Sequence, residues 1–212
     1  MCDNPRMRAG CLSAVLLLLA TPLAAQSTRP KDIGTGKLLV ASRDLDDPNF
    51  AHTVVLLVHL DEDGVVGLVV NRRTKLPVAR ALEDLKSAKG RPDLLYAGGP
   101  VGRSDVLALA RSKAKIEDAD HVFGDVYLVN SAALLEKTMA ASTAETLHIY
   151  AGYAGWTPKQ LEAEVEIGAW FIFAADAGTV FAANPESLWQ HFISRTEERI
   201  AFVTAPVWYS RH

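Results

Sequence analysis

Cysteine is nearly absent from this sequence, and the little there is lies at the N-terminus. Cys2 and Cys11 are the two cysteines among 212 residues. If the first 25 residues are cleaved from the mature protein, as argued below, no thiol remains. This excludes disulfide bonds, thiolate nucleophiles and cysteine-ligated zinc from the mature chain.

The sequence also lacks an excess of positive charge. Its 22 basic and 25 acidic residues give a formal charge of −3, which does not supply the basic surface that nucleic-acid binding requires. We therefore do not expect a nucleic acid as a partner. With 49% hydrophobic and 22% charged residues, the composition is that of a globular protein. Disorder and fibrous structure are excluded for the chain as a whole.

The apolar run near the N-terminus is too short to span a membrane. Leu12–Ala20 has about nine residues, whereas a helix needs roughly 20 to cross a bilayer. The run follows Arg6 and Arg8 and precedes small residues ending at Ala25, which is the pattern of a secretory signal peptide. A wrongly assigned start codon and a buried helix are the alternatives. We predict a signal peptide over 1–25, export to the periplasm and no membrane span after its removal.

Removal of this segment changes the charge and length of the mature protein. The segment contains Asp3, Arg6 and Arg8, so about 187 residues remain, of which 20 are basic and 24 acidic, with a charge of −4. Residues 26–33 are polar and predict a short flexible lead-in. Residues 34–212 have the length of one domain.

Strand and helix patterns alternate along the rest of the chain. The strongest is a β-hairpin: Thr53–Leu60 and Val65–Val70 are apolar, β-branched runs joined by Asp61–Gly64, which ends in an Asp-Gly turn. We predict the α+β class, in a single domain whose mixed, mostly antiparallel sheet has this long hairpin at its centre and about four helices around it. Further strands are expected at 38–41, 94–96, 106–109, 122–129, 147–150 and 170–173. Helices are expected at 77–87, at 132–140 after the cap Ser131, after Thr157, with which Gln160 would complete a capping box, and after Asn184. We expect Trp170, Trp189 and Trp208, which lie on apolar segments, in the core.

Standard catalytic and metal-binding motifs are absent from the sequence. There is no Gly-x-Ser-x-Gly elbow, no His-Glu-x-x-His and no Walker loop. His59, Asp61 and Asp63 would share a face if their strand continued, but a solvated acidic turn explains them as well. We predict no metal site and no cofactor.

Three short stretches of unusual composition stand between the predicted elements. Asp46–Phe50 joins the first strand to the hairpin, Gly98–Val101 follows a strand, and Gly152–Trp156 leads directly into a capped helix. Glycine allows close approach of the backbone to a partner, and a helix N-terminus offers free amides. These stretches are either turns that the fold requires or the loops of a shallow ligand- or peptide-binding site.

The same stretches carry a family resemblance. Over about residues 34–200 the chain resembles the YqgE/AlgH family, on the following segments in order: Gly36–Ser42, Asp47–Phe50, Gly67–Asn71, Gly98–Val101 and Gly152–Trp156, with Gln160, Leu161 and Glu164 after them. One departure is Arg103-Ser104-Asp105, where a more apolar strand start is expected. The resemblance implies a single α+β domain without an established enzymatic activity. The family is generally taken as cytosolic, so a cytoplasmic location is the alternative to export.

Two classes of function follow. In the first, a non-catalytic binding or regulatory protein uses a loop-lined surface for a small ligand or a protein partner. In the second, the chain is an unrecognised hydrolase or transferase, with Ser42, Asp47 and His52 as the nearest candidate groups. A transcriptional regulator, as named for some family members, is a further alternative. We favour the first and assign no catalytic residue. The candidate ligand-binding residues are Asp47, Asn49, Phe50, Asn71, Gly98, Gly99, Pro100, Gly155, Trp156 and Gln160.

Overall fold

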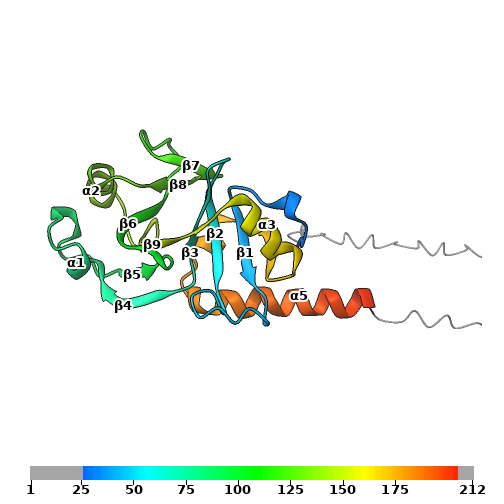
Figure 1. Ribbon diagram of the computed structural model, residues 1–212. Helices are drawn as coiled ribbons and strands as arrows, with labels where there is room; N and C mark the ends of the chain where they lie inside the picture. The colour runs from blue at the N-terminus through cyan, green and yellow to red at the C-terminus, as the bar shows by residue number, and fades with distance from the viewer. Residues whose placement is uncertain (1–25, 205–212) are drawn as a thin grey trace, which may run out of the picture.

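The strands of the structure form one curled sheet (Figure 1). This computed structural model describes the backbone of residues 26–204 and the side chains of residues 26–197. The strands are β1 Lys37–Ala41, β2 Val54–Leu60, β3 Val65–Val69, β4 Arg73–Pro77, β5 Leu94–Ala97, β6 Val101–Arg111, β7 Asp120–Phe123, β8 Val126–Val129, β9 Leu147–Trp156 and β10 Trp170–Ala174.

Most of the sheet is antiparallel. Eight strands follow one another in the order β10-β1-β2-β3-β9-β6-β8-β7, while β5 pairs with both β4 and β9. The pairing of β5 with β9 is parallel, and the other named pairs are antiparallel. The predicted α+β class and mostly antiparallel sheet are therefore confirmed.

Short helices cover the ends and outer side of this sheet. They are α1 Val78–Ala81, α2 Ala132–Ala141, α3 Pro158–Glu166, α4 Ala177–Val180 and α5 Leu188–Thr204, with single 3₁₀ turns at Pro30–Asp32, Lys86–Ala88 and Pro185–Ser187. Figure 1 shows α5 crossing below β1 and β2, with α1 and α2 on the opposite side of the molecule. Among the described residues, no helix combines the length and apolar character that a bilayer crossing requires.

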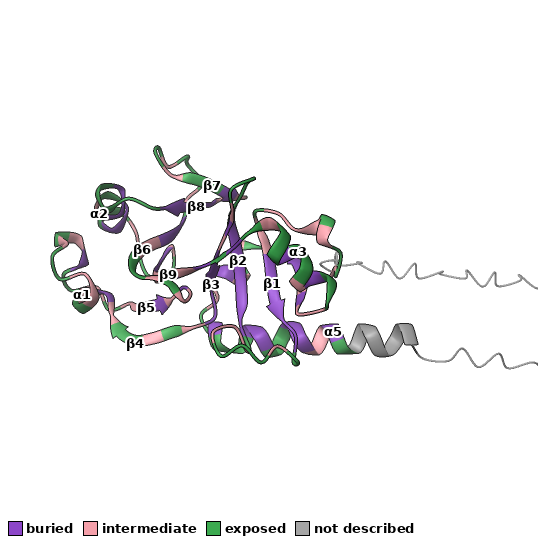
Figure 2. Ribbon diagram, in the orientation of Figure 1, coloured by how far each residue is buried: buried purple, intermediate pink, exposed green. Residues whose placement is uncertain are grey.

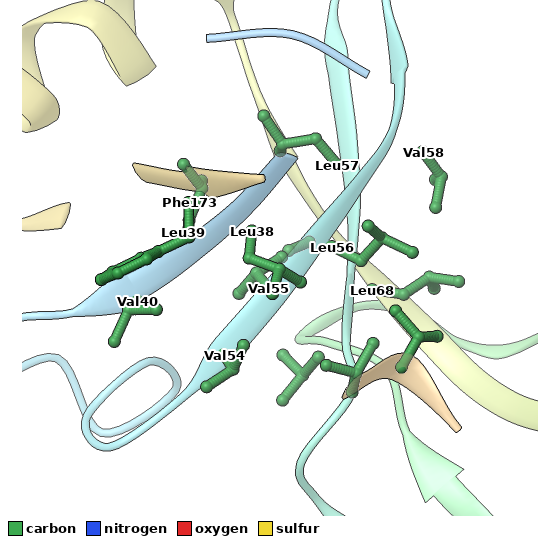
Figure 3. Close-up of a cluster of buried hydrophobic side chains, with 14 of the residues drawn as sticks. Leu38, Leu39, Val40, Val54, Val55, Leu56, Leu57, Val58, Leu68 and Phe173 are labelled. Atoms are coloured by element: carbon green, nitrogen blue, oxygen red, sulfur yellow. The ribbon is translucent and has the colours of Figure 1, made fainter. Parts of the chain in front are cut away.

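The predicted central hairpin is confirmed and is the centre of the larger hydrophobic core. In β2 and β3, residues 54–57 and 68–69 are fully buried, so both faces of the hairpin are covered (Figure 2). Figure 3 shows these side chains beside those of β1 and Phe173 of β10. A smaller core lies between α1, α2, β5 and β6. The hairpin therefore fixes the centre of the sheet, from which the candidate loops extend.

Two predicted helix caps are present, whereas the side chain of Asn184 makes no capping hydrogen bond. The Ser131 side chain accepts a hydrogen bond from the Leu134 N–H, and the Thr157 side chain accepts one from Gln160. The second half of the expected capping box is missing, because the Gln160 side chain donates to Glu164 instead of returning to Thr157. Trp170 and Trp189 lie in the core as predicted, whereas Trp208 lies outside the described residues.

Several predicted boundaries are wrong. The helix expected over 77–87 ends at Ala81, because Leu82 leaves the helical conformation (φ −126°, ψ 47°). The single strand expected over 122–129 is divided into β7 and β8 at Gly124, which has a positive φ of 51°. The stretch 152–156, expected to be a loop, is the second half of β9. There it pairs with β3, and this long-range pairing overrides the low strand propensity of its glycines.

Candidate functional site

The loop between β1 and β2 is fixed at one end by an aromatic cluster. The Phe50 ring stacks on Trp156 with centroids 5.4 Å apart and meets Trp170 edge-on at 5.6 Å. Glu164 of α3 orients both indoles, since its Oε2 accepts a hydrogen bond from Trp156 at 3.0 Å and from Trp170 at 2.8 Å. We call Phe50, Trp156, Glu164 and Trp170 the aromatic clamp. It holds the loop against the body of the protein.

Two residues after β3, Asn71 and Arg72, hold the same C-terminal part of this loop. The Asn71 side chain accepts a hydrogen bond from the Val54 N–H at 2.8 Å and donates one to the His52 carbonyl at 3.0 Å. The Arg72 guanidinium donates to the carbonyl oxygens of Asn49 and Ala51. His52 has a φ of +60°, which is unusual for a residue other than glycine. Residues 49–52 of the loop are therefore held by the two side chains that follow β3.

The glycine pair after β5 allows two backbones to lie in contact. A Cβ at Gly98 would lie 2.2 Å from the Gly152 carbonyl oxygen, and one at Gly99 would lie 2.1 Å from the Tyr153 carbonyl carbon. Both glycines are therefore required for the close packing of this turn against β9. This brings the turn beside the loop that Arg72 holds.

A cavity of about 280 Å³ opens where this loop and this turn meet. Arg72 and Arg103 line it, and no acidic side chain does. Burial lowers the pKa of the Arg72 guanidinium, and the charge of Asp47 acts in the opposite direction. We call this cavity the cationic pocket. Its lining residues are Asn49, Arg72, Thr74, Ala97, Gly99, Pro100, Arg103 and Ala151.

The sequence-predicted site residues divide into three groups. Asn49, Gly99 and Pro100 line the cationic pocket. Phe50, Asn71 and Trp156 hold the loop in place, as does Asp47, whose carboxylate accepts a hydrogen bond from the Asn49 N–H at 2.7 Å. The remaining residues are not among those that line the pocket: Gly98 packs on β9, Gly155 lies within β9, and Gln160 bonds to Glu164.

Sequence reasoning missed the two arginines that give this pocket its charge. Arg72 directly follows the motif residue Asn71, and Arg103 begins the stretch 103–105, where the family resemblance leads us to expect a more apolar strand start. Neither position predicts a site by itself, because the residues meet only when β4 and β6 are placed beside the loop. The sequence signal that could have indicated this site is a basic residue next to a motif, as Arg72 is next to Asn71.

The candidate catalytic groups do not form a hydrogen-bonded set. Among the described residues, no hydrogen bond joins the side chains of Ser42, Asp47 and His52 to one another. Ser42 is buried, and the His52 ring lies against Trp189 with centroids 4.2 Å apart. Among these three residues the geometry therefore offers no serine–histidine pair to support the hydrolase alternative.

The acidic turn of the hairpin has a local role. His59 Nε2 lies 2.7 Å from Asp61, and this contact, with the N–H groups of Gly64 and Asp63, lowers the pKa of the Asp61 carboxyl. In the part of the chain that the structure describes, no cluster of three or more histidine, cysteine or acidic residues is arranged for a metal ion. His59 and Asp61 therefore stabilise the turn.

Comparison with known proteins identifies the family. The model of the AlgH-like family matches residues 38–201. The chain belongs to the AlgH-like family. It is 39% identical to a UPF0301 protein of Streptomyces avermitilis and 40% identical to one of Streptomyces coelicolor, in each case over 175 residues, 80% of this chain and 90% of the relative. The family resemblance predicted from the motifs is confirmed.

Solved structures agree with this AlgH-like fold. The solution structure of the AlgH protein from Pseudomonas aeruginosa is 31% identical, with a TM-score of 0.64, and the match covers 82% of this chain and 95% of that one. A crystal structure of a Corynebacterium diphtheriae protein is 24% identical, with a TM-score of 0.66, covering 77% and 87% of the two chains. The second likeness supports the fold alone.

Proposed function

We propose that this AlgH-like protein is a non-catalytic binding protein whose cationic pocket takes an anionic group, a carboxylate or a phosphate. The observation that carries the proposal is the presence of two guanidinium groups, from Arg72 and Arg103, in a cavity with no acidic lining residue. Guanidinium is the side-chain group best suited to bind carboxylate and phosphate oxygens.

The surroundings of Arg72 support this role. Its hydrogen bonds go to neutral backbone carbonyls of the loop, at 3.0 Å for Ala51 and 3.5 Å for Pro48, so its charge is not neutralised by direct contact. The side chain is partly buried, where an electrostatic interaction is stronger than in water. An anion in the pocket would therefore gain a positioned positive charge without displacing an existing partner.

Arg103 supplies the second charge from a different element. It lies exposed on β6, and no carboxylate of the described residues pairs with it. Two arginines from separate elements can approach an anion from two directions. The Thr74 hydroxyl lines the same cavity and adds a neutral donor.

The test is a titration of the purified protein with inorganic phosphate and, separately, with acetate, followed by amide NMR shifts. We expect saturable shifts at Asn49, Ala97 and Gly99. Arg103→Ala should weaken binding about tenfold, the loss of one charge-assisted contact, whereas Arg80→Ala, an exposed arginine on α1, should not. The two anions distinguish phosphate from carboxylate as the preferred group. Equal affinities of the two variants would contradict the proposal.

We also propose that the protein is exported. The support is the order of basic residues, apolar run and small residues over 1–25, which lie outside the described residues. N-terminal sequencing of the protein purified from its host should begin at Gln26. An intact Met1 would contradict export.

A further inference from the structure

The strands that form the cationic pocket carry a second cavity on their opposite face. This cavity has a volume of about 330 Å³. Side chains alternate along a strand, so Thr74 of β4 lines the cationic pocket, as does Arg72 just before the strand, while Arg73 lines the second cavity. In the same way Ala97 belongs to the first cavity and Tyr96 to the second. Neighbouring residues of β4 and β5 therefore line different cavities.

Three rings form one wall of the second cavity. Tyr96 of β5 stacks on His148 of β9 with centroids 4.7 Å apart and an interplanar angle of 21°. On its other side His148 meets Phe181, which follows α4, at 4.8 Å. All three residues line the cavity. A flat aromatic surface of this kind favours contact with another ring.

The polar atoms beside these rings lack partners. His148 is 7% exposed, and its Nδ1 has no hydrogen-bond partner. The hydroxyl of the fully buried Tyr150, whose ring lies 5.2 Å from Tyr96, also has none. Burying a polar group without a partner is unfavourable. Burial lowers the pKa of His148 to about 4 and raises that of Tyr96, so both rings are uncharged at neutral pH.

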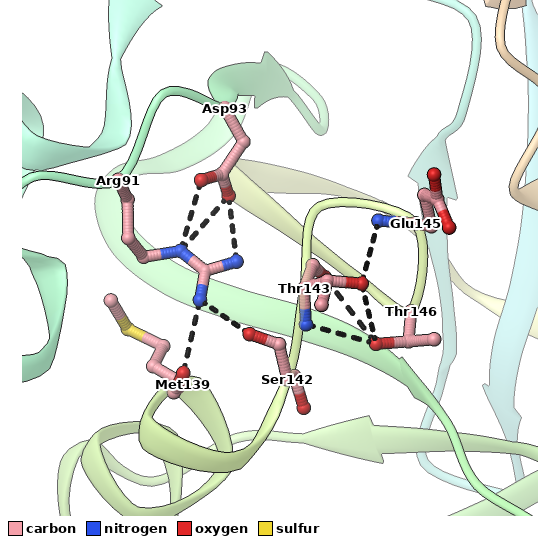
Figure 4. A network of polar contacts seen from close by, with 7 residues as sticks. All are labelled: Arg91, Asp93, Met139, Ser142, Thr143, Glu145 and Thr146. Carbon is pink, nitrogen blue, oxygen red and sulfur yellow. Dashed lines mark hydrogen bonds and ion pairs between the residues drawn. The ribbon is translucent and has the colours of Figure 1, made fainter.

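The charged groups around this cavity are mostly paired with one another. On one side Arg91 forms a bidentate ion pair with Asp93 and donates to the carbonyls of Met139 and Ser142, which fixes the wall of the cavity (Figure 4). On the other side Arg73 pairs with Glu186 at 3.1 Å. Glu145 is exposed at the rim. Among its lining residues the cavity therefore has no unpaired cation for an anion, and its aromatic wall is uncharged.

We propose that this cavity, the aromatic pocket, binds a small uncharged aromatic molecule that donates a hydrogen bond to His148. The stacked rings would supply apolar contact. Because His148 Nδ1 is itself buried, the ligand would donate to Nε2, the other nitrogen of the neutral imidazole, and this hydrogen bond would orient it. The proposal does not depend on the function of the cationic pocket, because the two cavities have opposite chemistry and share no lining residue.

Indole and 1-methylindole are matched probes, since the second has no N–H donor. We expect indole to give saturable NMR shifts at the ring signals of Tyr96, His148 and Phe181, with a dissociation constant of about 1 mM or tighter. 1-Methylindole should bind about tenfold more weakly, the loss of one hydrogen bond.

Two variants test the role of His148 in this binding. His148→Phe keeps a ring and removes the acceptor, so it should lower indole affinity to that of 1-methylindole and leave the latter unchanged. Arg103→Ala, on the opposite face, should alter neither affinity. Circular dichroism establishes whether His148→Phe is folded. The comparison of indole with 1-methylindole in the unchanged protein tests the proposal without any variant. Absence of saturable binding, shifts that map elsewhere, or equal indole affinity in His148→Phe would overturn the proposal.

Discussion

The two faces of the β4–β5–β9 region differ in charge although a single sheet separates them. Arg72 and Arg73 are neighbours in the chain and point to opposite faces. Arg72 binds neutral carbonyl oxygens, whereas Arg73 binds the carboxylate of Glu186. The same type of side chain therefore leaves a free positive charge on one face and a neutralised one on the other. The partner of an arginine, more than its presence, decides what a pocket can bind.

Both faces depend on the glycine turn after β5. A substitution in this turn is therefore expected to have the largest effect on stability. In Gly99→Ala the new Cβ would lie 2.1 Å from the backbone of Tyr153, and neither backbone can move without separating β5 from β9. We expect a loss of at least about 4 kcal/mol in the free energy of unfolding, measured by urea denaturation, together with loss of binding at both pockets.

Gly34→Ala is the matched control for that variant. No atom lies within 4 Å of a Cβ at Gly34, so the change should stay within about 0.5 kcal/mol. Equal stabilities of the two variants would show that the turn adapts, and that the two faces are less tightly connected than their geometry indicates.

Removal of the Glu164 carboxylate from the aromatic clamp should weaken binding at the cationic pocket and leave binding at the aromatic pocket unchanged. Glu164→Leu leaves the indole N–H groups of Trp156 and Trp170 without their acceptor. We expect a loss of about 3 kcal/mol in unfolding free energy, because two partly buried donors become unpaired. The loop of the cationic pocket should loosen and anion affinity should fall, while indole binding on the other face persists.

Glu162→Leu, an exposed position on the same helix, is the control for the clamp. It should change neither stability nor binding appreciably. If Glu164→Leu weakened indole binding as much as anion binding, the clamp would support the whole sheet and not one loop.

The aromatic face should make stability depend on pH. The folded protein has His148 with a pKa lowered to about 4 by burial, while the unfolded chain has the ordinary value of 6.5. The unfolded state therefore binds more protons between these values, and stability falls as the pH falls through this window. From about pH 7 to about pH 4.5 the loss should be about 2 kcal/mol, measured by urea denaturation at each pH.

His148→Phe should remove that part of the pH dependence, because no titrating group remains at this position. His191→Gln, a change of an exposed histidine on α5, serves as the control. An unchanged pH dependence in His148→Phe would mean that the acid sensitivity originates outside the aromatic pocket.

The smallest effect on stability is expected from Glu186→Gln. The Arg73–Glu186 pair is solvent-exposed, with side-chain exposures of 35% and 48%, so its loss should cost less than about 0.5 kcal/mol. The substitution would, however, leave Arg73 without its carboxylate partner. The aromatic pocket would then have an unpaired positive charge, as the cationic pocket does. We expect weak acetate shifts beside Tyr96 in NMR. Glu197→Gln, which breaks the exposed pair with Arg43, should not produce them.

Much of the fold is predictable from local sequence. The Asp-Gly turn between two apolar runs specifies the hairpin, and Ser131 and Thr157 specify two helix starts, because these features act over a few residues. The second half of β9 could not be predicted this way. Gly152 and Gly155 disfavour a strand locally, and pairing with β3 imposes one.

The candidate site was less predictable than the fold. Aromatic residues such as Phe50 and Trp156 are typical of ligand-contacting surfaces. Here, however, their rings stack on each other and hold a loop. Asn49, Gly99 and Pro100 were found because they belong to motifs. Arg72, Arg103 and His148 gain their surroundings from strands far apart in the sequence, so no local pattern indicates their charge state or their partners.

The position of β1 between β2 and β10 has a consequence for the order of events during synthesis. Lys37 at the start of β1 lies opposite Ala174 at the end of β10. The pairing of the first strand with the last therefore cannot form until the last strand has been synthesised. Pairing over so long a stretch of chain slows folding. A growing chain leaves the apolar edge of Leu38–Ala41 unpaired until nearly all of the sequence has emerged.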